Sequence, residues 1–202
     1  SVAQSLLARG MVAQADLAGL ALVACGTRSP VMDLSWFEYE DSALDTVWHE
    51  SNRCWRTPEV VPSDVTPVDV DVATLVKSHN CLLGLPDNRR SKIVSSARRF
   101  ELSLARRYQG DQAIDLCTAF ELILDSGGEG GISWSNGLRC AGFLGGSADA
   151  RRGNRDIVQS LYGIRNESVH GGDLPDKVKT KTMGKIGVAE VIGKSRILYS
   201  RL

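Results

Sequence analysis

The distribution of apolar and polar residues beyond about residue 70 has the three-to-four-residue period of amphipathic helices. After Pro86-Asp87, apolar residues recur at this spacing at Ile93, Ala97, Phe100 and Leu104. Three basic residues, Lys92, Arg99 and Arg106, fall on the opposite face of the same stretch. The pattern therefore predicts an amphipathic helix with a basic outer side.

The same period predicts three further helices, over residues 111–125, 132–144 and 151–170. The glycine-rich segment 127–131 breaks the first of these patterns and is expected to form a loop between helices. Gly171-Gly172 ends the predicted 151–170 helix, since glycine is common just beyond the end of a helix. The second half of the chain is therefore predicted to be a series of helices joined by short glycine-containing loops.

A last helix is expected to open at Pro175-Asp176, with Asp176 as its N-cap. Three glycines in this stretch, Gly184, Gly187 and Gly193, oppose the prediction. Each one costs about 1 kcal/mol relative to alanine inside a helix.

The front of the chain has a different pattern. Residues 3–24 are compatible with one helix, but residues 30–68 combine tryptophans, acidic residues and prolines, which predicts an irregular or short-stranded segment. We therefore expect two parts: residues 1–70, a helix and a connecting segment of unassigned role, and residues 71–202, a helical domain. The predicted fold class is mainly α, a helical bundle.

Composition is that of a globular protein, with 202 residues, 43% hydrophobic and 24% charged. The longest apolar run, Leu17 to Cys25, is about half of the roughly 18 residues that span a bilayer, so no membrane partner is expected. The five cysteines include no Cys-x-x-Cys pair, which argues against a disulfide framework and favours the cytoplasm. Because the chain begins with Ser1, an additional N-terminal domain or a partner protein is left open.

The net charge of zero conceals a gradient along the chain. Residues 1–76 contain four Lys/Arg against eleven Asp/Glu, a net charge of −7, and residues 77–150 have a net charge of +1. Residues 151–202 contain eleven Lys/Arg against five Asp/Glu, a net charge of +6. A basic C-terminal quarter favours a polyanionic partner, although solvated helix faces give the same count.

Known phosphate and metal motifs are missing or incomplete. The glycines of segment 127–131 are followed by no Lys-Ser/Thr pair, so they do not form a phosphate-binding loop. His79 with Cys81, and His49 with Cys54, lack third and fourth ligands at the usual zinc spacings. Neither a metal nor another cofactor is therefore expected.

One cluster of side chains does suggest chemistry, near the end of the predicted 151–170 helix. Arg165 offers a planar, permanently charged fork suited to a phosphate, and His170 can exchange a proton near neutral pH. On a regular helix these two residues point about 140° apart, whereas Asn166 and His170 share a face. Convergence needs an unwound helix end or a second copy of the chain. The helix dipole alone also favours such cations at a C-terminus, which is the structural alternative.

Several segments, taken in order, resemble the HEPN superfamily, and in particular its Apea-like branch. These segments are Ala113-Ile114-Asp115-Leu116, Phe120-Glu121-Leu122, Arg139-x-Ala141-x-x-Leu144 and Tyr162-x-x-Arg165-Asn166-x-x-x-His170-Gly171. The resemblance covers about residues 75–202 and leaves residues 1–70 outside. Some HEPN toxins carry a tyrosine three residues after the histidine, a target for inactivation by an antitoxin, but Asp173 stands at that position here.

The resemblance implies an all-helical bundle that forms a symmetric homodimer and cuts RNA without a metal, at a cleft built from two Arg-x4-His motifs. Many such proteins act as toxins or in defence against phage. In this hypothesis Arg165 holds the phosphate, His170 transfers a proton, and Asn166 orients His170 or the phosphate. Glu121 either supports Arg165 by charge pairing or is an ordinary surface carboxylate. DNA would be spared because it lacks the 2′-hydroxyl group.

Further basic residues are candidates for guiding the RNA backbone, namely Arg151, Arg152, Arg155, Lys177, Lys179 and Lys181. A rival hypothesis is a non-catalytic HEPN-like module that dimerises and binds a nucleic acid or a nucleotide. A third is a purely structural bundle.

Overall fold

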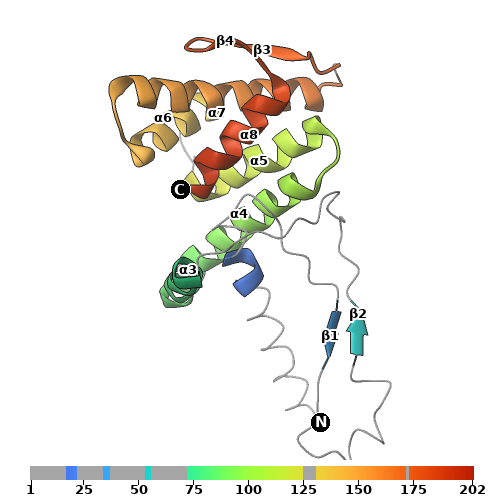
Figure 1. The fold of residues 1–202 in the computed structure, drawn as a ribbon, viewed down its shortest axis with the longest axis vertical. Helices are drawn as coiled ribbons and strands as arrows, with labels where there is room; N and C mark the ends of the chain where they lie inside the picture. Colours follow the sequence, from blue (N-terminus) through green and yellow to red (C-terminus); the bar gives the residue numbers. More distant parts are fainter. Residues whose placement is uncertain (1–16, 22–33, 37–52, 56–71, 125–130, 172) are drawn as a thin grey trace, which may run out of the picture.

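The computed structural model describes residues 17–21, 34–36, 53–55, 72–124, 131–171 and 173–202. The described chain is predominantly helical, so the prediction of a mainly α fold is confirmed (Figure 1). Within these residues, no helix combines the length and the apolar character that crossing a bilayer requires.

The described residues form six helices, α3 to α8, and two small two-stranded antiparallel sheets. In chain order they are β1 (Leu34–Trp36), β2 (Arg53–Trp55), α3 (Val72–Gly84), α4 (Asp87–Ala105), α5 (Gln109–Leu124), α6 (Ile132–Leu144), α7 (Ala148–Val169), β3 (Lys177–Thr180), β4 (Gly184–Gly187) and α8 (Val188–Ser200). Strand β1 pairs with β2, and β3 pairs with β4. Residues 17–21 are also helical, and the rest of the predicted 3–24 helix lies outside the described residues.

The predicted helices of the C-terminal part agree closely with the structure. Helix α6 has the expected bounds, and α4 and α5 begin within two residues of the predicted positions. Helix α7 begins three residues earlier than expected because Ser147 caps it, its hydroxyl oxygen accepting the Ala150 N–H at 3.2 Å. The glycine-rich loop falls mostly at 125–130, outside the described residues.

The prediction of a last helix that opens at Pro175-Asp176 is wrong for the first half of that segment. Residues 177–187 form the β3–β4 hairpin, in which Thr180 lies opposite Gly184, and only from Val188 is the chain helical. The Lys-Val-Lys-Thr run alternates polar and β-branched residues, which favours a strand over a helix. Gly184 takes a φ of +72°, a left-handed conformation that suits a turn. Asp176 caps no helix; its carbonyl accepts the Val188 N–H at 3.1 Å and closes the base of the hairpin.

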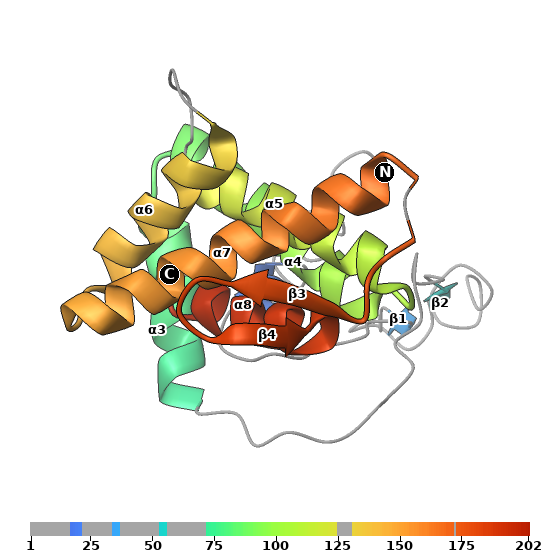
Figure 2. The ribbon, with the colours of Figure 1, turned by 90° about the horizontal axis from the view of Figure 1, so that it is seen from above.

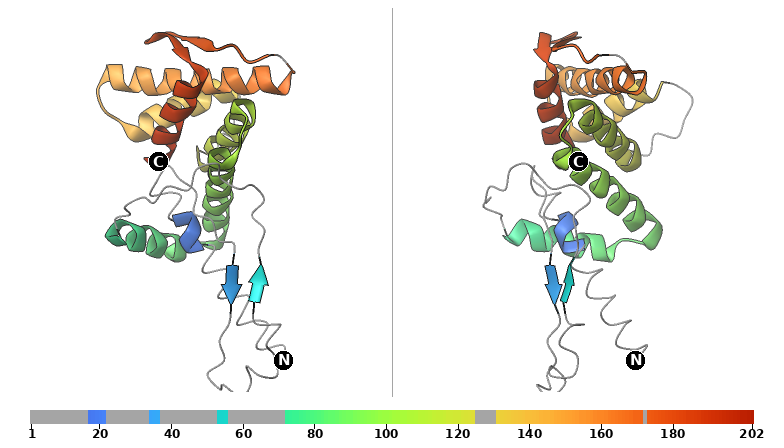
Figure 3. Two further views of the ribbon diagram at one scale, coloured as in Figure 1. Left: turned by 45° about the vertical axis from the view of Figure 1, so that its right-hand side comes forward. Right: turned by 90° about the vertical axis from the view of Figure 1, so that its right-hand side faces the viewer.

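The core is built around α5, which packs against α4, α6, α7 and α8. Its buried residues Leu116, Cys117 and Phe120 meet Phe100 of α4 and Leu161 of α7 in one apolar cluster. Helix α3 contributes no buried residue and lies at the opposite end of the helical part from α7 (Figure 3). Helices α4 to α8 therefore form the packed unit, with α7 and the β3–β4 hairpin at its far end.

Tyr199 of α8 joins three helices at the centre of this unit. Its ring stacks on Phe100 at 4.3 Å between centroids and meets Phe120 edge-on at 5.6 Å. Ser96 donates its hydroxyl proton to the Ala119 carbonyl at 2.7 Å, so the Tyr199 hydroxyl, also 2.7 Å from Ser96, acts as donor to it. Burial raises the pKa of Tyr199 to about 12.

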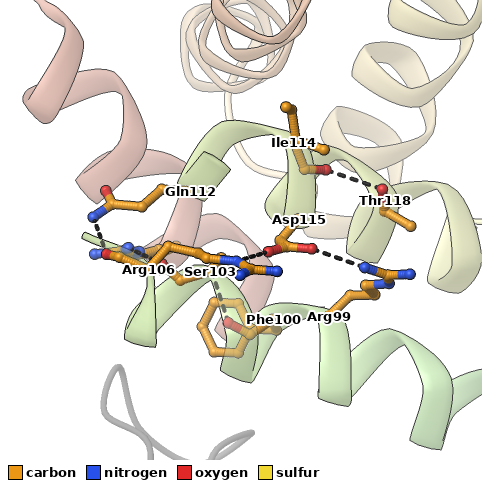
Figure 4. A network of polar contacts seen from close by, with 9 residues as sticks. Arg99, Phe100, Ser103, Arg106, Gln112, Ile114, Asp115 and Thr118 are labelled. Carbon is orange, nitrogen blue, oxygen red and sulfur yellow. Dashed lines mark hydrogen bonds and ion pairs between the residues drawn. The ribbon is translucent and has the colours of Figure 1, made fainter. Parts of the chain in front are cut away.

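A buried carboxylate ties α4 to α5. Asp115 of α5 accepts a hydrogen bond from Arg99 Nη1 at 3.0 Å and another from Arg106 Nε at 2.9 Å (Figure 4). The side chain of Asp115 is 4% exposed, whereas both arginines reach the surface. Because each carboxylate oxygen has its own guanidinium donor, the negative charge is compensated inside the protein.

We predict that Asp115→Asn lowers the unfolding free energy by about 2 kcal/mol, because it removes the charge from two hydrogen-bonded ion pairs at a buried position. Urea denaturation followed by circular dichroism measures the change. The matched control is Asp149→Asn, which breaks a pair with Arg152 in which Asp149 is 89% exposed and which contributes less than about 0.5 kcal/mol. Equal losses in the two variants would show that Asp115 has no special structural role.

Candidate functional site

The end of α7 presents the Arg165 to His170 segment on the surface. His170 is the C-cap residue, with φ −88° and ψ 7°, and its N–H donates to the Asn166 carbonyl at 3.1 Å. Gly171 follows with a φ of +74°, the left-handed conformation that commonly ends helices. The helix therefore stays regular up to the histidine and stops immediately after it.

Arg165 is half-buried, and its guanidinium makes one weak local contact. Its Nη1 donates to Asn166 Oδ1 at 3.4 Å, near the upper limit for a hydrogen bond. Among the described residues it forms no ion pair with any carboxylate. A guanidinium held on a helix without an anion beside it is suited to bind one from outside.

Asn166 and His170 are both exposed on the last turn of α7. Their main chains are joined by the hydrogen bond described above, as expected for residues four apart. In the described structure, no hydrogen bond joins the side chains of Arg165 and His170. Because the helix is regular between them, the two side chains leave it about 140° apart, and one chain does not bring both to one point.

A buried polar network lies one turn before Arg165. Tyr162 is 3% exposed, and its hydroxyl oxygen accepts a hydrogen bond from Asn136 Nδ2 at 2.6 Å. The same hydroxyl donates to the Cys117 carbonyl at 3.4 Å. Burial first, and then the neighbouring Cys117 and Glu121, raise the pKa of the Tyr162 phenol well above its usual range. The phenol therefore stays protonated and links α5, α6 and α7.

Glu121 belongs to this network and not to an ion pair with Arg165. Its half-buried carboxylate lies near the Tyr162 phenol, and its negative charge helps to raise the pKa of that phenol. Burial raises the pKa of the Cys117 thiol, with Glu121 raising it further and Arg165 lowering it. Glu121 and Arg165 thus act on the same buried thiol from α5 and α7, although no ion pair within 4.0 Å joins them in the described structure.

The arginines at the start of α7 have partners within the fold. Arg151 donates to the Gly146 carbonyl at 2.9 Å, and Arg152 pairs with Asp149. Arg155 lies 3.9 Å from the buried Asp156 and sits over the ring of Trp134 at 5.4 Å. Each of these three candidates for guiding RNA therefore makes a contact within the fold, and their role in guiding RNA stays a prediction.

Three lysine candidates occupy a different place. Lys177, Lys179 and Lys181 are exposed on the β3–β4 hairpin, and the sequence pattern did not group them with Lys185, which lies on β4 opposite Lys179. The alternation in Lys-Val-Lys-Thr is the signal that would have predicted the strand and the pairing. None of the four forms an ion pair with a described residue.

Comparison of the chain with models of known protein families, with curated proteins and with solved structures finds no match. The resemblance to the HEPN superfamily therefore rests on the sequence motifs quoted above. Among the described residues, no three His, Cys, Asp or Glu side chains gather as a group that could hold a metal ion.

The end of α7 gives a first prediction from this site. Gly171→Ala should destabilise the protein by about 1 kcal/mol, because alanine is strained at a φ of +74° although nothing lies within 4 Å of the added methyl group. Gly163→Ala, on the exposed face of the same helix and also with space for a methyl group, should stabilise it by about 0.5 to 1 kcal/mol. Thermal unfolding of both variants tests whether the changes in stability have opposite signs. A loss of stability in both variants would contradict the geometry of this helix end.

The buried network gives a second prediction. Tyr162→Phe should lower the unfolding free energy by about 1 to 3 kcal/mol at pH 7, because it leaves the buried Asn136 amide without its partner. The raised pKa of Tyr162 also stabilises the native state fully below pH 10, the usual value for tyrosine, and this contribution is lost as pH rises above it. Urea denaturation between pH 7 and pH 11 should therefore show a shallower alkaline loss in the variant.

Tyr108→Phe is the control for this experiment, since Tyr108 is 70% exposed. It should change the unfolding free energy at pH 7 by less than about 0.5 kcal/mol. If the unfolding free energy falls as steeply between pH 7 and pH 11 in Tyr162→Phe as in the wild type, the phenol of Tyr162 does not contribute to the alkaline loss of stability.

Proposed function

We propose that this chain is a metal-independent endoribonuclease of the HEPN type. The observation that carries the proposal is the state of Arg165, a half-buried guanidinium with no carboxylate partner among the described residues, five positions before an exposed histidine at a helix end. An arginine that has no carboxylate counter-ion can bind a phosphate without first breaking an ion pair. The HEPN-like motifs support RNA as the source of that phosphate.

The proposed reaction uses the ribose of the RNA as nucleophile. The 2′-oxygen attacks the adjacent phosphorus, its proton passes to a His170 imidazole, and a bond forms between the 2′-oxygen and phosphorus. The bond to the 5′-oxygen of the next nucleotide breaks, and that oxygen takes a proton from an imidazolium. Arg165 stabilises the charge that builds on the phosphate oxygens. The products end in a 2′,3′-cyclic phosphate and a 5′-hydroxyl.

We propose that the active form is a homodimer. Since Arg165 and His170 leave the helix about 140° apart, a twofold arrangement of two α7 helices is the simplest way to bring both groups to one phosphate. Two histidines in one cleft can also divide the roles of base and acid when their surroundings differ. The resemblance to HEPN proteins further favours a role as a toxin or an effector of phage defence in the cytoplasm.

The test is incubation of the purified chain with a defined mixed-sequence RNA in excess EDTA, with fragment ends identified by mass spectrometry. We expect cleavage by the wild type with 2′,3′-cyclic phosphate ends. His170→Ala and Arg165→Ala should each reduce the cleavage rate by about 100-fold or more, because each removes a proton carrier or the charge that stabilises the transition state. A DNA strand of the same sequence should stay intact.

The matched controls are His79→Gln and Arg107→Ala, at a half-buried histidine of α3 and an exposed arginine after α4. Both should cleave at the wild-type rate. Absence of cleavage by a folded, dimeric wild type would overturn the ribonuclease and favour the non-catalytic binding module. Cleavage by a chain that sediments as a monomer would contradict the shared cleft while leaving the reaction intact.

A further inference from the structure

The β3–β4 hairpin carries an uncompensated positive surface, and we infer that this surface binds the phosphate backbone of single-stranded RNA without reading its sequence. We call it the lysine face, made of Lys177, Lys179, Lys181 and Lys185. The choice of RNA among polyanions rests on the function proposed above, whereas the existence of the positive surface is independent of that function.

The register of the hairpin separates an inner from an outer face. Val178 lies opposite Ile186, and both pack against the apolar core. Side chains alternate along a strand, so Lys177 and Lys179 of β3 point to the other side, and Lys185 lies directly opposite Lys179. All four lysines are exposed, with Lys181 in the turn. The inner face is thus anchored, and the outer face consists largely of lysine side chains.

The hairpin itself contains no acidic residue, although Asp176 directly precedes it and Glu190 follows in the first turn of α8. The segment from Lys177 to Gly187 contains four lysines and no aspartate or glutamate. Within the described chain, none of these lysines forms an ion pair. Like charges directly opposite each other on paired strands destabilise the hairpin, so the pairing of Lys179 with Lys185 works against the fold. A bound row of phosphates would remove that repulsion and release counter-ions.

The hairpin has a closed turn, and its first strand begins a few residues after the end of α7. Its turn is closed by Thr180, whose hydroxyl accepts the Met183 N–H and donates to the Gly184 carbonyl, both at 3.0 Å. The two strands lie alongside α7 and α8 (Figure 2). Lys177 follows His170 by seven residues, which limits the distance between their Cα atoms to about 25 Å. An RNA strand on the lysine face therefore starts within reach of the proposed cleavage site.

The test measures the affinity of the full chain for a fluorescein-labelled 12-nucleotide RNA that is 2′-O-methylated throughout, so that it lacks the 2′-hydroxyl nucleophile. We expect Lys179→Gln/Lys185→Gln to weaken binding about tenfold at low salt. The slope of log affinity against log salt should fall by about 1.4, the value for two lost phosphate contacts on a single strand. The melting temperature of the double variant should be higher than that of the wild type, because the repulsion between Lys179 and Lys185 is gone.

The matched control is Lys77→Gln/Lys194→Gln, which removes two lysine charges from α3 and α8. It should change the affinity less than twofold. Equal losses in both double variants would overturn the inference, since they would show an effect of net charge alone. Binding to vesicles that contain phosphatidylserine is measured in parallel. If the Lys179→Gln/Lys185→Gln variant loses vesicle binding but keeps the wild-type affinity for RNA, the inference is overturned in favour of a membrane surface.

The same variants separate this inference from the proposed reaction. If the hairpin variant loses RNA affinity while the wild type cuts no RNA, the lysine face stands and the ribonuclease does not. If RNA is cut in a manner that depends on Arg165 and His170, and the hairpin variant binds as tightly as the wild type, the ribonuclease stands and the lysine face is refuted.

Discussion

The burial of α5 between α4, α6, α7 and α8 is the constraint on which the rest of the structure depends. A helix covered on several sides must compensate every polar side chain that it brings into the core. Asp115 is compensated by two arginines from the α4 side, and the Cys117 carbonyl, two residues further along α5, accepts a hydrogen bond from the phenol of Tyr162. These polar links fix which faces of α4 and α7 turn towards α5, and apolar packing alone would leave that choice open.

The orientation of α7 has a direct consequence for the candidate site. Tyr162 points into the core, so Arg165, three residues later, lies at the edge of the core beside Cys117 and stays half-buried. His170 lies beyond the last buried turn and faces solvent. The packing that stabilises α7 therefore separates the two groups, and the chemistry proposed for them depends on a second copy of the chain.

The helices could be predicted from sequence because each has an apolar stripe of sufficient length, and α6 was found with its bounds intact. The β3–β4 hairpin was missed because a four-residue alternation is short and Pro175-Asp176 resembles a helix start. Arg165, Asn166 and His170 were proposed as site residues from residue type and spacing, and they stay a prediction. The contact of Arg155 with Trp134 of α6, and the position of Glu121 near Tyr162 of α7, could not be predicted, because both arise only through tertiary packing.

The structure also changes the meaning of the basic C-terminal quarter. The net charge of +6 counts every cation of residues 151–202 equally. In the structure, however, the arginines at the start of α7 interact with Asp149, Asp156, Trp134 or a backbone carbonyl. The hairpin lysines have no such partners among the described residues, and two of them oppose each other at a cost to the fold. Long-range attraction of a polyanion depends on charge that remains uncompensated at the surface. The hairpin lysines therefore contribute such charge at the end of the helical unit that also holds Arg165, whereas Arg152 and Arg155 are partly neutralised by their carboxylate partners.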